Sequence, residues 1–311
     1  MSKEKCMMCG RPAIVGRSYS GEVLCEQCFG QSLIEKTRKA ISKWNMLQRT
    51  DRIAVALSGG KDSAVLLSIL VNIQSRFPES EIIAVTLNEG KAEDSERIKI
   101  VTKLTQQLDV DYVVSSYQDL FSVNLDEVVS KAREMNSPLS PCSFCAVLRR
   151  QGLNILARRI DADKLALGHN LDDEVQSMLM NLIRGDLQRL ARSGPVQKAS
   201  LSQLVPRIKP LYYIPEEDIA LYAQFLGLPS QTNPCSYRDQ SLRSEIRSWL
   251  NSFEGRHSGS KYNLYATISR IIAILQTQPQ EDFEVCRICG EPTSREICST
   301  CQLLKELGLK P

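Results

Sequence analysis

The sequence predicts an α/β protein built on a doubly wound parallel sheet, with a small zinc module at each end of the chain. Three observations predict this. Strand and helix patterns alternate between residues 52 and 182, a glycine-rich loop joins the first of these strands to the first helix, and eight of the eleven cysteines form two paired sets at the ends. Strands that alternate with helices form a parallel sheet covered on both faces.

The terminal cysteines have the C-x2-C…C-x2-C spacing of closed tetrahedral zinc sites. The two sets are Cys6, Cys9, Cys25, Cys28 and Cys286, Cys289, Cys298, Cys301. Modules this short need metal because they bury little apolar surface. The expected organisation is an N-terminal zinc finger at 1–30, an α/β domain with a helical C-terminal part at 31–275, and a C-terminal zinc finger at 284–311 after a linker at 276–280.

Composition favours a cytosolic protein with a substantial core. Of 311 residues, 42% are hydrophobic, and the formal net charge is only +3. No apolar run approaches the roughly 18 residues that a bilayer-spanning helix needs, so no membrane partner is expected. The first residues contain no apolar signal segment. In a reducing compartment, paired cysteines favour metal over disulfides.

Apolar periodicity places the elements along the chain. An amphipathic helix is expected at 32–47. The expected strands are 52–57, 82–87, 112–114 and 164–167, and the helices that follow them are 64–73, 94–108, 125–135, 145–160 and 172–182. Further on, the pattern predicts an extended segment at 206–210 and helices at 215–226, 241–253 and 262–275. Ligands bind beyond the carboxyl ends of parallel strands, where the glycine loop, Leu87 and Gly168 are expected.

The loop Ser58-Gly59-Gly60-Lys61-Asp62-Ser63 is suited to phosphate binding, because it follows a strand and begins a helix. Its glycines let the backbone approach phosphate. The helix N-terminus adds N–H donors and a favourable dipole, and Lys61 with the hydroxyls of Ser58 and Ser63 completes an anion site. It is not a Walker A loop, since G-x-x-x-x-G-K is absent. The alternative is an ordinary tight turn.

Three cysteines remain outside the terminal sets: Cys142, Cys145 and Cys235. Three thiolates leave one position of a metal or cluster free, and an iron–sulfur cluster normally takes four cysteines. Cys142 and Cys145 begin a predicted helix, where the thiol pKa is expected to be lowered. Two alternatives stay open: a metal-free persulfide and disulfide chemistry, and three buried, inert thiols.

Acidic and basic residues further along the chain allow several roles. Asp172 or Asp173 either caps a helix or holds Mg2+ or a water beside the phosphate loop. The two histidines, His169 and His257, are interpreted as incidental, the latter on the surface. A stretch with six basic residues and one acid, Asp186, is interpreted as a solvated surface. The alternative is that these basic residues contact a phosphate backbone. They are Arg184, Arg189, Arg192, Lys198, Arg207 and Lys209.

Four segments together resemble a known family. They are SGGKDS (58–63), PCSFCAVLRRQ (141–151), GHNLDDEVQ (168–176) and MNLIRGDLQRLAR (180–192). With the terminal cysteine pairs, they resemble the tRNA 2-thiolation enzymes, a group of the PP-loop ATP pyrophosphatases that includes the cytosolic protein of archaea and eukaryotes and the thermophile enzyme TtuA. The resemblance covers nearly the whole chain and implies an adenine nucleotide alpha hydrolase-like fold.

The resemblance also implies an activity, a tRNA-uridine 2-sulfurtransferase that uses ATP with Mg2+. ATP adenylates the O2 of a uridine, and sulfur then displaces AMP at C2. By position, Cys142, Cys145 and Cys235 match the ligands of a [4Fe-4S] cluster, and Asp173 matches a catalytic acid. The implied nucleotide contacts are Ala56, Leu57, Ser58, Gly59, Gly60, Lys61, Asp62, Ser63, Leu87, Arg149 and Gly168. Arg149 is expected to neutralise phosphate, since arginine is no substitute for a proton-transferring lysine.

Within the family, CAVLRRQ (145–151) favours thiolation of the wobble uridine at position 34. The alternatives are the T-loop uridine at position 54, a PP-loop ligase that forms amides, and a zinc-bearing RNA-binding protein with a vestigial loop. The implied partners are tRNA and a sulfur donor, either a ubiquitin-like protein thiocarboxylate or free sulfide. A homodimer is expected. The tRNA set, the donor and the choice between cluster and persulfide stay open at this point.

Overall fold

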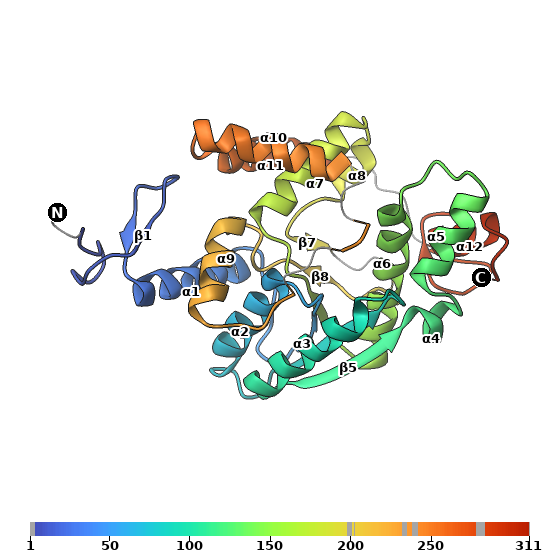
Figure 1. Ribbon diagram of the computed structural model, residues 1–311, viewed down its shortest axis with the longest axis horizontal. Helices are drawn as coiled ribbons and strands as arrows, with labels where there is room; N and C mark the ends of the chain where they lie inside the picture. Colours follow the sequence, from blue (N-terminus) through green and yellow to red (C-terminus); the bar gives the residue numbers. More distant parts are fainter. Residues whose placement is uncertain are drawn as a thin grey trace.

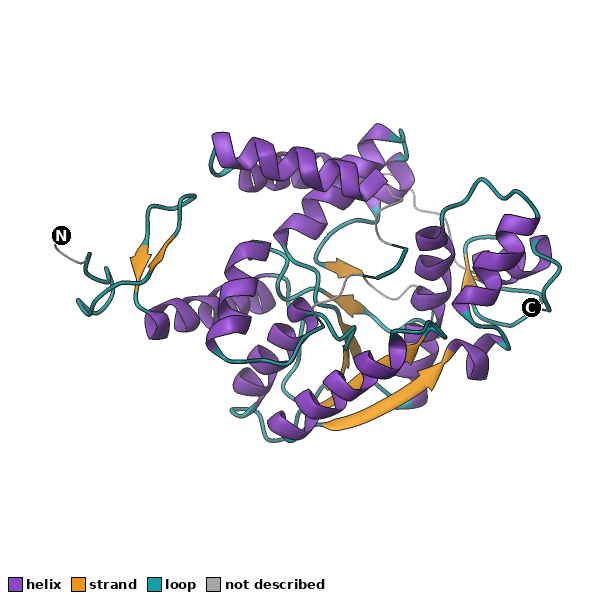
Figure 2. Cartoon of the chain, viewed as in Figure 1, coloured by secondary structure: helices purple, strands orange, loops and turns teal. Residues whose placement is uncertain are grey.

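The computed structural model describes residues 4–197, 201, 203–231, 235–237, 242–277 and 284–310. At its centre is a six-stranded sheet with the order β5-β4-β3-β6-β8-β7 (Figure 2). The strands are β3 (Arg52–Ala56), β4 (Glu81–Asn88), β5 (Asp111–Ser116), β6 (Lys164–Ala166), β7 (Val196–Gln197) and β8 (Arg207–Ile208). Every neighbouring pair is parallel except β7 with β8. The predicted parallel sheet is therefore confirmed, with one antiparallel strand at its edge.

Helices cover both faces of the sheet, and β3 shows why. Successive side chains of a strand point to opposite faces. Ile53 and Val55 belong to one core cluster, with α2 (Lys61–Gln74) and α3 (Asp94–Leu108). Ala54 belongs to a second cluster on the opposite face. That cluster includes side chains of α4 (Tyr117–Phe121), α5 (Leu125–Glu134) and α6 (Pro141–Arg159).

The second half of the chain adds a helical layer. Its helices are α7 (Leu171–Ile183), α8 (Leu187–Ala191), α9 (Glu216–Phe225), α10 (Leu242–Arg256) and α11 (Ser260–Leu275). Helix α9 packs on α2, whereas α10 and α11 pack on α7. In Figure 1 the orange pair α10 and α11 lies along α7. This layer brings α9 and α10 toward the beginning of α2, where the phosphate loop ends.

The two cysteine-rich ends lie on opposite sides of the molecule (Figure 1). The N-terminal module pairs β1 (Val15–Gly16) with β2 (Val23–Leu24) and continues into α1 (Glu26–Lys43). The C-terminal module pairs β9 (Glu284–Val285) with β10 (Pro292–Thr293) and ends in α12 (Ser299–Glu306). Buried Arg17 pairs with Asp218 of α9 at 2.9 Å, and Glu291 pairs with Arg158 of α6.

Several boundaries differ from the sequence-based expectations. Helix α1 begins at Glu26 rather than at residue 32, so Cys28 lies in its first turn. Helix α6 begins at Pro141, because proline is favourable at the first helical position. The segment expected to be extended contributes β8, whereas β7 and α4 were not predicted. Lys198 and the linker at 278–280 lie outside the described residues.

Within the described ranges, no helix combines the length and apolarity needed to cross a membrane.

Candidate active site

The phosphate loop connects β3 to α2 at the carboxyl edge of the sheet. Gly59 has φ +77°, and a Cβ there would lie 2.6 Å from Cγ of Arg97, so only glycine fits the turn. Inside the loop, the Ser63 hydroxyl accepts from the Ser58 amide at 3.2 Å and donates to the Gly60 carbonyl at 2.9 Å. These bonds fix the loop around the N-terminus of α2, where N–H groups favour an anion.

The end of β6 closes the other side of the loop. A Cβ on Gly168 would lie 2.9 Å from the backbone nitrogen of Ser63, so the two segments are in direct contact. The side-chain amide of Asn170 donates to the Asp62 carboxylate at 2.8 Å. Of the predicted nucleotide contacts, Leu57 is buried, Ala56 is half-buried and Ser58 is exposed.

Lys61 lies between two carboxylates. Its Nζ is 2.7 Å from Glu216 of α9 and 3.1 Å from Asp62. Burial lowers the pKa of Lys61, but the charges of Asp62 and Glu216 outweigh burial and raise it. Burial, together with the charge of Asp173, raises the pKa of Asp62. A lysine that stays charged beside the loop is suited to bind phosphate.

The expectation that Asp172 or Asp173 caps α7 needs correction. The N-cap is Asn170, whose side chain accepts from the Asp173 amide at 2.9 Å. Asp173 is the reciprocal member of this capping box. It also lies 3.6 Å from Arg243, and burial raises its pKa. Asp172 instead accepts from the Glu216 amide at 2.8 Å, and so joins α7 to α9.

The two histidines have different environments. His257 is exposed, as predicted. His169 follows β6, and its buried Nδ1 has no hydrogen-bond partner among the described residues. Burial, with the nearby charge of Lys209, lowers the pKa of His169 to about 4. The imidazole is therefore neutral at physiological pH.

The three central cysteines converge at the beginning of α6. Cys142 lies in the first turn of this helix, and Cys145 is its fifth residue. The Cys142 thiol donates to the Tyr237 carbonyl at 3.3 Å, which places the segment 235–237 against the same turn. Cys142 and Cys145 are half-buried and buried, respectively, and Cys235 is half-buried. In the sequence, 89 residues lie between Cys145 and Cys235, and the fold brings the two cysteines together.

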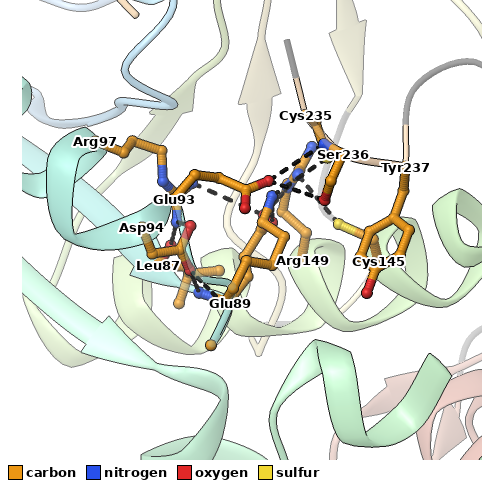
Figure 3. Close-up of polar contacts among 12 residues, drawn as sticks. Leu87, Glu89, Glu93, Asp94, Arg97, Cys145, Arg149, Cys235, Ser236 and Tyr237 are labelled. Atoms are coloured by element: carbon orange, nitrogen blue, oxygen red, sulfur yellow. Dashed lines mark hydrogen bonds and ion pairs between the residues drawn. The ribbon is translucent and has the colours of Figure 1, made fainter. Parts of the chain in front are cut away.

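Two cationic side chains contact these sulfurs. Arg149, one turn after Cys145, donates to Sγ of Cys145 at 3.1 Å. Nζ of Lys91 lies 3.5 Å from Sγ of Cys235. Both cations also contact buried Glu89. Figure 3 shows the Glu89, Arg149 and Cys145 side chains close together. Arg149 thus lies on the sulfur side, and its expected contact with phosphate stays a prediction.

The pKa values of these thiols differ from the sequence-based expectation. The helix N-terminus was expected to lower them, but burial, together with neighbouring Cys235, raises the pKa of Cys142. Burial raises the pKa of Cys145 to about 11, despite Arg149. Desolvation therefore outweighs the nearby positive charges of Arg149 and Lys91. Thiols of this kind are deprotonated when a metal centre supplies positive charge.

A chain of contacts links the cysteines to the phosphate loop. Arg97 of α3 packs over Gly59 and donates to the Leu87 carbonyl at 2.6 Å. Its guanidinium lies 3.9 Å from Glu89, the residue that also holds Arg149. The Gln231 amide donates to the Gly59 carbonyl at 2.8 Å, on the segment that leads to the third cysteine.

Sequence reasoning missed Glu89, Lys91 and Arg97. A signal was present, because Asn88-Glu89-Gly90-Lys91 follows a buried strand at its carboxyl end.

The two terminal cysteine sets form compact groups. Within each, all four sulfurs lie within 4.8 Å of one another. Among the residues that the structure describes, these two are the only such groups. Four sulfurs around one point suit a single tetrahedral ion. The central trio is more spread out, as expected for ligands on different irons of a cluster. The donor set, three thiols with two cations beside them, therefore fits a [4Fe-4S] cluster.

The basic stretch divides in two. Lys209 pairs with Glu174 at 2.7 Å and is 12% exposed, so it serves the fold. Arg207 donates to the Arg150 carbonyl at 2.8 Å. Arg184 and Arg189 remain exposed.

Comparison with known proteins identifies the family. The PP-loop domain family matches residues 31–253. The tRNA 2-thiolation protein NcsA of Haloferax volcanii is 33% identical, over 97% of this chain and 99% of its own length. The chain belongs to the tRNA 2-thiolation family of PP-loop proteins.

Two further relatives in the tRNA 2-thiolation family are similar to this chain along most of its length. The cytoplasmic tRNA 2-thiolation protein 1 of Caenorhabditis elegans is 30% identical over 96% of this chain and 79% of its own length. A solved structure, the U34-tRNA thiolase NcsA from Methanococcus maripaludis with its [4Fe-4S] cluster, is 35% identical, with a TM-score of 0.86. It covers 100% of this chain and 99% of its own. The predicted fold and family are confirmed.

Proposed function

We propose that this protein synthesises 2-thiouridine at the wobble position of tRNA, with ATP as the activating substrate and a [4Fe-4S] cluster at its three central cysteines. As a member of the tRNA 2-thiolation family, it is a tRNA sulfurtransferase. The relative named as a U34-tRNA thiolase is similar along the whole chain, which supports position 34 over the T-loop uridine.

One observation carries the proposal: the sulfur-rich centre lies beside the phosphate loop. Arg97 packs on Gly59 and reaches Glu89, and Glu89 holds Arg149 against Cys145. An amide ligase that uses the same loop has no need for three cysteines at this position. A sulfurtransferase that activates its substrate with ATP needs the phosphate loop and the sulfur-rich centre to reach the same substrate.

The first reaction step is assigned to the loop. The uridine O2 attacks the α-phosphorus of ATP, the bond from that phosphorus to the bridging oxygen breaks, and pyrophosphate leaves. The loop N–H groups, Lys61 and the hydroxyls of Ser58 and Ser63 are proposed to hold the phosphates, which their position at the N-terminus of α2 supports. Asp62 and Asp173, whose pKa values are raised by burial, are the carboxyls proposed to bind Mg2+ or act as the catalytic acid.

In the second step, a sulfur nucleophile attacks C2, the C2–O2 bond breaks, and AMP leaves with the former uridine oxygen. AMP is a good leaving group, whereas the unactivated carbonyl oxygen is a poor one. Cys142, Cys145 and Cys235 would hold a cluster, which would supply an iron position that no protein ligand fills. Arg149 and Lys91 supply positive charge next to the thiolates.

The remaining assignments complete the proposal. Zn2+ is proposed at the two terminal sets, and the exposed Arg184 and Arg189 are proposed to contact the tRNA backbone. The sulfur donor is a ubiquitin-like protein thiocarboxylate or free sulfide. We also propose the three-part division 1–30, 31–275 and 284–311, a homodimer, and a cytoplasmic location, the last supported by the names of eukaryotic relatives.

The test is a product analysis under anaerobic conditions. The full chain is incubated with an unmodified tRNA that has uridine at both positions 34 and 54, Mg-ATP and sulfide. The expected result is one AMP and one pyrophosphate per thiouridine, with sulfur at position 34 only. AMP formed without tRNA, or sulfur at position 54, would contradict the proposal.

A further inference from the structure

Glu89 is a buried carboxylate surrounded by three cations. Its side chain is 1% exposed. Lys91 lies 2.8 Å from one carboxylate oxygen, and Nε of Arg149 donates to the other at 2.7 Å. Arg97 lies 3.9 Å away. Burial raises the pKa of Glu89, but Arg149, Lys91 and Arg97 outweigh burial and lower it to about 2. The carboxylate is therefore permanently charged at any working pH.

Two of these cations also contact the sulfurs. The Arg149 guanidinium lies between Glu89 and Cys145, with Nη2 at 2.5 Å from the carboxylate and 3.1 Å from the sulfur. Lys91 lies between Glu89 and Cys235 in the same way, at 2.8 Å and 3.5 Å. One carboxylate thus fixes the position of two cations, and each cation lies on a different cysteine of the trio.

The third cation is held by other groups. Arg97 pairs with Asp94 at 2.9 Å and donates to the Leu87 carbonyl at 2.6 Å, and both contacts are closer than its distance to Glu89. Its aliphatic part packs on Gly59 of the phosphate loop. Loss of the Glu89 charge is therefore expected to release Lys91 and Arg149 while Arg97 keeps supporting the loop.

We propose that Glu89 is a positioning residue for sulfur transfer, which holds Lys91 at Cys235 and Arg149 at Cys145 and so provides a fixed pair of positive charges at the sulfur centre. This inference rests on the proposed function, which gives the three cysteines their role. Three thiolates and an anionic sulfur nucleophile repel one another in a poorly solvated site. Cations fixed before the reaction stabilise this negative charge without reorganising.

The test compares Glu89→Gln with the wild-type full chain, purified anaerobically with its cluster. The substitution keeps the shape and removes one negative charge near the trio. Because Lys91 and Arg149 are then released from the sulfurs, the cluster would lose two adjacent positive charges, an effect that outweighs removal of the one carboxylate behind them, so the midpoint potential is expected to fall. Thiolation is expected to fall by at least about tenfold, while the ATP dissociation constant stays within about twofold.

A matched control lies at the beginning of β4, the strand that Glu89 follows. Glu81 begins β4, pairs with Arg52 at 2.6 Å and is 45% exposed, so Glu81→Gln removes a carboxylate–arginine pair far from the sulfurs. Its potential and thiolation rate are expected to match the wild type. Lys91→Met removes one of the two cations directly and should lower the potential by a smaller amount. If Glu89 acted only through its own charge and did not hold the cations, Glu89→Gln would raise the potential instead.

The outcomes separate this inference from the proposed function. An unchanged or raised potential in Glu89→Gln, when the wild-type protein thiolates tRNA, would overturn the role of Glu89 alone. A lowered potential in both Glu89→Gln and Lys91→Met, when the wild-type protein makes no thiouridine, would refute the function and keep the charge arrangement. A wild-type chain without iron would refute both. If Glu89→Gln does not fold, Glu89→Asp with Lys91→Met decides, with a near-wild-type potential expected for the aspartate.

Discussion

The eleven cysteines of this protein form two kinds of site, which differ in how many sulfurs they contain and in what surrounds them. At each terminus, four sulfurs lie within 4.8 Å of one another. Both terminal modules pack on the central domain through ion pairs, Arg17 with Asp218 and Arg158 with Glu291. At the centre, three sulfurs from two distant segments meet beside two cations and the phosphate loop.

The difference between these sites indicates their roles. A closed set of four thiolates satisfies a tetrahedral ion and leaves no position for a substrate. A trio of thiolates would leave a ligand position of a bound cluster free, and its neighbours Lys91 and Arg149 bring charge that a structural site would not require. We therefore propose that the terminal sets stabilise the fold and that the trio takes part in the reaction. The following substitutions test this contrast, beginning with the largest expected effect on thiolation.

Removal of a central ligand should abolish the reaction. Cys142→Ala is expected to lower thiolation by at least about a hundredfold, because the cluster loses one of its three ligands. Zinc content, melting temperature and ATP affinity should stay close to the wild type. Thiouridine is quantified by mass spectrometry of digested tRNA. Thiolation at the wild-type rate by this variant would contradict the assignment of the reaction to the central trio.

Gly59→Ala should impair the phosphate loop. The residue has φ +77°, and the added methyl would meet Arg97 at 2.6 Å. Strain of this kind costs about 1–3 kcal/mol, so ATP affinity is expected to fall by roughly tenfold. Iron content should be unchanged, because Arg97 reaches the sulfur centre only through Glu89. Calorimetric titration with a non-hydrolysable ATP analogue measures the effect, and loss of iron together with ATP binding would contradict the separation of the phosphate loop from the sulfur-rich centre.

A terminal ligand should affect stability more than chemistry. Cys28→Ala is expected to lower zinc from about two ions per chain to about one and to reduce the melting temperature. Thiolation per folded molecule should fall by less than about tenfold, since Arg17 and helix α1 still join the module to the core. Metal analysis and differential scanning calorimetry provide the measurements. If Cys28→Ala and Cys142→Ala lost thiolation equally, the terminal set would be part of the reaction centre.

The smallest effect on thiolation is expected at His169. Its pKa in the folded protein is about 4, below the unfolded value, so the unfolded chain binds more protons between these values. The stability that neutral His169 contributes is present above pH 6.5 and is lost as the pH falls toward 4.

At pH 5 this loss is about 2 kcal/mol. His169→Gln should therefore lose less unfolding free energy between pH 7 and pH 5 than the wild type does, by about that amount. Urea unfolding at both pH values measures the difference. Identical pH dependence in the two proteins would show that the imidazole is not held neutral.

Local features of the fold were predictable from sequence. The terminal sets follow from short cysteine spacings, and the strand, loop and helix at 52–74 follow from periodicity and glycine position. The α/β class and the family were confirmed as well. The domain boundaries and the roles of individual site residues stay predictions.

Features that depend on tertiary contacts were not predictable. Glu89 and Arg149 are 60 positions apart, and no pattern in the sequence indicates that one carboxylate holds both Arg149 and Lys91. The expected thiol pKa was wrong for Cys142 and Cys145, because local helix position was known but burial was not. Asn170 was missed as the cap of α7, because the two acids at 172 and 173 offered an equally good pattern.

The most direct test of the account measures iron, zinc and thiouridine in the same preparations of the wild-type chain. Samples are prepared with increasing cluster content at constant zinc. The account predicts that thiouridine formation rises in proportion to iron, from none in the iron-free protein to a maximum at about four irons per chain. Full thiolation by an iron-free chain that retains its zinc would contradict the account and favour a persulfide on the same cysteines.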